Sequence, residues 1–131
     1  MQNVFEDDES GRGWYWSWNG LAGDTLEGMV VFFPSQAAAQ ADFTFHCAAP
    51  FDGTGRRIRP ITEIQDLINV EFARLDLCAA AGQPTVVKIV AVGTGTNWDD
   101  VWPVGEPIEQ GLCRGQIEAA IEQLQKMYSV P

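Results

Sequence analysis

Three tryptophans alternate with other residues near the start of the chain, and this alternation limits the folds open to it more than any other feature. Trp14, Trp16 and Trp18 are separated by Tyr15 and Ser17. Because successive side chains of a β-strand point to opposite faces, one side of such a strand would carry all three indoles. The pattern predicts a strand whose indole side faces a core. The alternative is an exposed platform on which a ligand stacks.

Turn residues and apolar spacing continue this strand into a mixed pattern of strands and helices. Asn19-Gly20 is a turn signal after the first strand, and it predicts an antiparallel hairpin with the β-rich run that follows. Apolar residues at intervals of three and four predict two long helices later in the chain. The predicted elements are strands at 14–18 and 26–33, a short helix at 35–41, a strand at 42–47, a helix from Thr62 that ends before Gly82, an interior strand at 85–92 and a helix from about Glu109 to Tyr128.

This element order, β-β-(short α)-β-α-β-α, is typical of an α+β fold. We expect a mainly antiparallel sheet of about four strands with two long helices packed on one face. A three-layer α/β arrangement, with the last strand inserted between its neighbours, is the alternative. Residues 1–12 contain four consecutive acids and no period that would bury a face, so they are predicted to form an acidic flexible tail. Residues 13–131 are predicted to form a single globular domain.

The charge balance restricts the kinds of partner. Eighteen acidic residues against eight basic ones give a formal net charge of −10. Such a field repels nucleic-acid phosphates and anionic membranes, and it attracts basic proteins. No run of apolar residues approaches the ~18 that a membrane helix needs, and the first residues do not resemble a secretory leader. We therefore expect a cytoplasmic protein that binds a basic protein partner and contacts neither nucleic acid nor membrane directly.

The positions of the cysteines do not match a known zinc-binding or disulfide pattern. Cys47, Cys78 and Cys113 lie far apart, are odd in number and lack the spacing of zinc or disulfide scaffolds. Reduced thiols are the simple expectation. His46, next to Cys47, cannot pair with it if both lie on the predicted strand, because neighbours on a strand point apart. His46 could meet Cys78 or Cys113 only through the fold, and the acids near residue 100 lack the spacing of a calcium-binding loop. The sequence thus offers few catalytic candidates and no cofactor motif, and it favours a protein without enzymatic activity.

Two tryptophans flank a pair of acids in the segment before the last helix. Trp98 and Trp102 enclose Asp99 and Asp100, and Glu106 follows among prolines. Aromatic side chains supply binding energy in protein interfaces, and carboxylates steer a basic partner. The segment is predicted to be an irregular, partner-binding loop with its tryptophans at the surface. A packed loop that only covers the core is the alternative.

A loop of opposite charge lies earlier in the chain. Arg56, Arg57 and Arg59 follow Gly53-Thr54-Gly55 and could hold an anion with guanidinium and backbone N–H groups. A solvated loop that offsets the acid excess is the alternative.

The sequence favours a small acidic protein-binding module, of the inhibitor or immunity type, that covers a basic surface of its target. Two other functions stay open. One is a small-ligand-binding domain, or a weak enzyme, with an aromatic pocket. The other is a homo-oligomeric structural subunit, such as a homodimer, that would associate through an exposed strand edge or through the apolar seam of the last helix. The aromatic pocket would draw on the residues Trp14, Trp16, Trp18, Phe43, Phe45 and Tyr128.

Overall fold

The computed structural model of the protein describes residues 3–19, 26–28, 30–93, 95–104 and 107–131. The chain forms two compact units, Met1–Ala48 and Ala49–Pro131. Each unit combines helices with strands, which confirms the α+β class in its broad sense. Within the described residues, no helix is long and apolar enough to cross a membrane.

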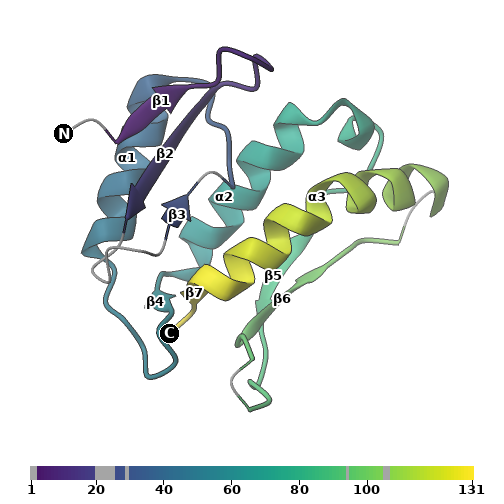
Figure 1. Ribbon diagram of the computed structural model, residues 1–131. Coiled ribbons are helices and arrows are strands. Elements are labelled where there is room, and N and C mark those ends of the chain that lie inside the picture. The colour runs from purple at the N-terminus through teal and green to yellow at the C-terminus, as the bar shows by residue number, and fades with distance from the viewer. Residues whose placement is uncertain (1–2, 20–25, 29, 94, 105–106) are drawn as a thin grey trace. The chain divides into compact units, whose positions relative to one another are not determined.

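The first unit is a three-stranded antiparallel sheet packed on a helix. Its sheet has the order β1-β2-β3, and α1 packs against β1 and β2, as Figure 1 shows. The predicted pairing of the tryptophan strand with the next strand is confirmed, since Ser17 lies opposite Gly28 in an antiparallel register. The elements of this unit are β1 (Val4–Glu6), β2 (Trp14–Asn19), β3 (Leu26–Gly28) and α1 (Gln36–Ala48).

Strand β1 lies where the sequence predicts a flexible tail. Val4 is opposite Trp16 in the antiparallel register and only 3% of its surface is exposed. The acids that suggest a tail begin only at Glu6, where the strand ends. Two apolar residues are too few to show a period in sequence, yet they suffice for a short edge strand once β2 offers hydrogen-bonding groups. Residues 4–6 are therefore part of the fold.

The predicted strand at 42–47 is wrong, because these residues continue α1. The Ser35 hydroxyl accepts a hydrogen bond from the Ala38 N–H at 3.1 Å, as a helix N-cap does. Ala39, Asp42 and His46 are buried at intervals of three and four, which places them on one helix face. The alternating apolar residues suggest a strand when read alone, but the capped alanine run before them propagates the helix.

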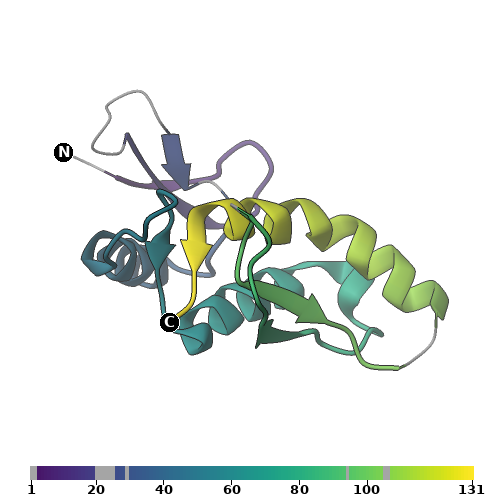
Figure 2. The same ribbon diagram turned by 90° about the horizontal axis from the view of Figure 1, so that it is seen from below.

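The second unit is built on two antiparallel helices with a β-ribbon beside them. Helices α2 and α3 lie side by side, and the ribbon of β5 and β6 packs with β5 on α2 and β6 next to α3 (Figures 1 and 2). Buried apolar residues of both helices, such as Ile64 and Ile117, form the core between them. The elements are β4 (Arg57–Ile58), α2 (Ile61–Arg74), the 3₁₀ helix η1 (Asp76–Cys78), β5 (Thr85–Lys88), β6 (Trp98–Val101), α3 (Pro107–Met127) and β7 (Tyr128–Ser129).

Two elements predicted in this unit end earlier in the structure. Helix α2 begins next to the expected Thr62 but ends at Arg74, because Leu75 adopts an extended conformation. The run 85–92 is not an interior strand: β5 ends at Lys88, and Val90 and Val92 beyond it are 89% and 88% exposed. A continuous apolar run does not by itself distinguish a buried strand from an exposed hairpin end, since both have the same residue types.

The strands do not form the predicted sheet of about four strands. Besides the three-stranded sheet of the first unit, the described strands form two separate pairs, β5 with β6 and β4 with β7. The β4–β7 pair is parallel, with Arg57 opposite Tyr128, and it joins the start of this unit to its end. A pairing over this sequence distance leaves no local pattern.

Candidate functional site

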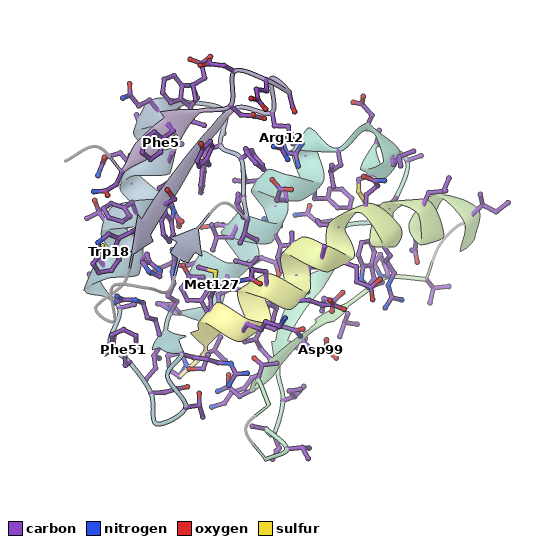
Figure 3. All side chains as sticks on the ribbon, viewed as in Figure 1. Phe5, Arg12, Trp18, Phe51, Asp99 and Met127 are labelled. Carbon is purple, nitrogen blue, oxygen red and sulfur yellow. A yellow bond between two sulfur atoms is a disulfide. The ribbon has the colours of Figure 1, made fainter. Side chains whose placement is uncertain are left out.

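An acidic groove with a volume of about 200 Å³ lies between strand β6 and helix α3. Three of the residues predicted to bind a partner line it, together with α3 residues one helical turn apart. Figure 3 shows Asp99 at this position, beside α3. We define the acidic groove by the lining residues Asp99, Asp100, Trp102, Arg114, Glu118 and Glu122.

Hydrogen bonds hold the β6 side of the groove. The Trp102 indole N–H donates to Asp100 Oδ2 at 2.6 Å, and the Asp100 backbone N–H donates to Asp99 Oδ1 at 2.9 Å. The Gln125 amide donates to the backbone oxygen of Trp98 at 3.2 Å, which ties α3 to the strand. The segment is thus a strand and its ordered end, where the sequence predicts an irregular loop.

A guanidinium already lies on the aromatic wall of the groove. The Arg114 Cζ is 5.6 Å from the centre of the Trp102 ring, within the range of a cation–π contact. Phe72 is another neighbour of this indole, and its ring centre is 6.5 Å away. Arg114 and Glu118 are exposed, and Trp102 and Asp100 are half-buried. The groove therefore combines anionic rims with an indole that accepts a cation.

The prediction that Trp98 lies at the surface is wrong. Its side chain is completely buried, and its indole N–H donates to the Tyr128 backbone oxygen at 3.0 Å. Trp98 is the first residue of β6, so its side chain points to the opposite face from Asp99. Its role is to anchor the strand, and it does not line the groove. Glu106, the remaining predicted residue, lies outside the described residues.

Sequence reasoning missed the contribution of α3 to the groove. Arg114, Glu118 and Glu122 recur at intervals of four, which places them on one helix face. This charged spacing was a usable signal for a polar stripe. It could not show that β6 lies next to the stripe, because the position of β6 depends on the tertiary fold.

The tryptophan row of β2 is divided between the core and the surface. Trp16 is 4% exposed, and its indole N–H donates to Asp42 Oδ2 at 2.8 Å. Trp14 and Trp18 are only half-buried. The inward orientation predicted for the row thus holds fully for its central member. Of the residues suggested for an aromatic pocket, Tyr128 belongs to the second unit and Phe45 is 53% exposed.

The three arginines of the basic loop make contacts within the protein. Arg56 Nε donates to the Gln125 backbone oxygen at 2.7 Å. Arg57 stacks on Phe51 with its Cζ 4.3 Å from the ring centre. Arg59 is 1% exposed and forms an ion pair with Glu63 at 2.9 Å. These contacts use the guanidiniums to hold the loop in place.

Asp52 organises the turn that precedes these arginines. Its Oδ1 accepts hydrogen bonds from the Thr54 N–H and hydroxyl, both at 2.7 Å, and from the Arg56 N–H at 3.1 Å. Partial burial opposes ionisation, but the hydrogen bonds from Thr54, Ser129 and Arg56 outweigh it and lower the pKa of Asp52 to about 2. The carboxylate is therefore fully ionised at neutral pH.

The first unit carries a second acidic surface around the β1–β2 connection, where the sequence predicts only an acidic flexible tail. Asp7 pairs with Arg12 at 2.7 Å, and the Arg12 guanidinium stacks on Phe32 at 4.1 Å from the ring centre. The hydrogen bond from the Arg12 side chain lowers the pKa of Asp7 below its usual value. Figure 3 labels Arg12 at this connection.

The cysteines contradict the expectation of reduced thiols. Cys78 and Cys113 form a disulfide that joins η1 to α3. They lie 35 residues apart, so no local sequence pattern predicts this disulfide. Cys47 is exposed on α1, whereas His46 on the same helix is completely buried. The two still point in different directions, although the reason is helical geometry and not strand alternation.

Among the described residues, no group of three or more His, Cys, Asp or Glu side chains is arranged to hold a metal ion. Comparison with protein-family models, with curated proteins and with solved structures found no match to this chain.

Proposed function

We propose that the protein is an acidic protein-binding module that takes up basic side chains of its partner in the acidic groove. The observation that supports this function best is the meeting of β6 and α3 carboxylates around the Trp102 indole. Lysine and arginine are attracted both by carboxylates and by the face of an indole. A partner with a basic surface, such as a target covered by an inhibitor or immunity-type protein, fits this chemistry.

The resident Arg114 indicates which cation fits best. Its guanidinium lies 5.6 Å from the centre of the Trp102 ring, so this indole already has a planar cation as a neighbour beside the carboxylates. A guanidinium can stack on the ring and donate two parallel hydrogen bonds to a carboxylate, whereas an ammonium cannot. Arginine side chains of the partner are therefore expected to bind more tightly than lysines.

The test uses a short fluorescein-labelled arginine peptide as the probe and the full chain as the receptor. Neutralising two groove carboxylates in the variant Asp99→Asn/Glu122→Gln should weaken binding about fivefold, since exposed ion pairs contribute roughly 0.5 kcal/mol each. The matched control is Asp66→Asn/Asp76→Asn, which removes the same charge from exposed positions outside the groove. Fluorescence anisotropy gives the dissociation constants.

The control should bind nearly as well as the parent chain, and a lysine peptide of equal length should bind more weakly than the arginine peptide. Equal weakening in both double variants would mean that only the net charge attracts the peptide. That result, or the absence of binding by the parent chain, would overturn the proposed site.

A further inference from the structure

The outer face of α3 exposes large apolar side chains. Ile108 and Leu112 are 75% and 52% exposed, and they lie four residues apart on the same side of the helix. The buried positions Cys113 and Ile117 belong to a different side, which packs against the rest of the unit. Adjacent exposed apolar residues on a helix are costly in water unless another surface covers them.

A row of small residues runs beside these two side chains. Gly111, Gly115 and Ala119 follow one another at intervals of four, so they form a line along the helix. A Cβ atom added at Gly111 or Gly115 would meet no described atom within 4 Å. Glycine inside a helix is less stable than alanine by about 1 kcal/mol. Contacts among the described residues therefore do not require a glycine at position 111 or at position 115.

The face thus combines two large apolar side chains with a line of small residues. We define the α3 outer face by the ridge residues Ile108 and Leu112 and the small residues Gly111, Gly115 and Ala119. Small residues allow two helix backbones to approach closely, and a neighbouring ridge can fill the space they leave. A surface that carries both parts is complementary to itself, as a two-fold symmetric contact requires.

We propose that two copies of this chain associate through their α3 outer faces, with the helices antiparallel. The charges at the edge of the face favour a second copy of this chain as the partner, and they favour antiparallel helices. Arg114 and Glu118 are both exposed and lie on one edge, one turn apart. In an antiparallel pair whose two-fold axis passes near Gln116, each Arg114 lies at the level of Glu118 in the other copy. The pairing forms twice and offsets part of the repulsion between two chains of net charge −10.

Sedimentation equilibrium of the full chain tests the proposal, at about 0.15 M salt so that long-range repulsion is screened. The parent chain should form a dimer, and Leu112→Glu should raise the dimer dissociation constant at least about 30-fold, as loss of a central interface side chain does. The matched control is Val92→Glu, because Val92 is 88% exposed at the end of the β5–β6 ribbon. The control should leave the dissociation constant within about twofold of the parent value.

A second variant separates the dimer from the stability of the fold. Gly115→Leu fills the small-residue row where no described atom lies within 4 Å, so the monomer should fold. Its melting temperature should not be lower than that of the parent chain at concentrations where the parent is monomeric. The dimer should be lost, because the helices can no longer approach. The charge reversal Arg114→Glu should weaken association of the two copies. The exchange of both charges, Arg114→Glu/Glu118→Arg, should restore association.

A parent chain that stays monomeric at the highest concentration would overturn the proposal. So would a dimer that tolerates both Leu112→Glu and Gly115→Leu. Arg114 and Glu118 also line the acidic groove, so the charge-exchange variants change both sites, whereas Leu112 and Gly115 do not line it. Leu112→Glu and Gly115→Leu should therefore abolish the dimer and leave binding of the arginine peptide within about twofold of the parent value, and these two variants distinguish failure of self-association from failure of partner binding.

Discussion

At the scale of single residues, Trp16 connects the sheet of the first unit to its helix. Its ring centre lies 5.3 Å from Phe43 and 4.5 Å from His46, both on α1. Its N–H also donates to the buried carboxylate of Asp42. One side chain thus provides apolar contact and the hydrogen bond that a buried carboxylate requires.

Trp16→Ala should lower the free energy of unfolding by about 3–5 kcal/mol, because it opens a cavity and removes the indole donor from Asp42. Trp14→Ala is the comparison, since Trp14 belongs to the same strand but is only half-buried. It should cost less than half as much. Urea unfolding monitored by circular dichroism measures both values. Equal losses for the two variants would contradict the assignment of Trp16 as the central core residue of this unit.

Asp52 should make stability depend on pH in acid. The pKa of Asp52 in the folded chain is about 2, below the ordinary value of 3.8. A lowered folded pKa means that the stabilisation is complete above about pH 4 and is lost as the pH falls towards 2. Asp52→Asn should therefore cost roughly 1 kcal/mol at pH 7, after allowance for solvent screening, and almost nothing near pH 2.

Urea unfolding at pH 7, 4 and 2 measures this difference. Asp66→Asn, a substitution of an exposed carboxyl on α2, serves as the control and should change stability by less than about 0.5 kcal/mol at each pH. A constant difference between Asp52→Asn and the parent chain at all three pH values would exclude the proposed ionisation.

At the scale of elements, the disulfide fixes η1 to the first half of α3. Cys78 and Cys113 are 1% and 0% exposed, so solvent reductants reach the bond poorly in the folded chain. The same half of α3 carries the exposed Ile108 and Leu112. A covalent connection holds this part of the helix in place where one of its sides lacks apolar contacts.

Replacing both cysteines, Cys78→Ala/Cys113→Ala, should lower the stability of the chain by about 3–4 kcal/mol. This value follows from the chain entropy released when a loop of 35 residues is no longer closed. Unfolding in urea, with and without reductant, tests it: reductant should destabilise the parent chain and leave the double variant unchanged. Cys47→Ala is the control and should respond to reductant as the parent chain does. A non-reduced mass equal to that of the fully reduced chain would disprove the bond.

At the scale of the whole molecule, the net charge of −10 is distributed over both compact units. The acidic groove belongs to the second unit, and the acidic β1–β2 connection belongs to the first. Binding of a basic partner would relieve repulsion among these carboxylates. The expected cytoplasmic location remains a prediction, and the disulfide is more typical of oxidising compartments.

Local patterns in the sequence predicted those parts of the fold that depend on neighbours along the chain. The period of α2, the hairpin that follows the tryptophan strand and the Ser35 cap were all readable, because contacts within a few residues produce them. The candidate site was predicted in part, through Asp99, Asp100 and Trp102. Tertiary structure decided the rest. The burial of Trp98, the Cys78–Cys113 bond and the approach of α3 to β6 join distant segments, and only the path of the folded chain determines which segments meet.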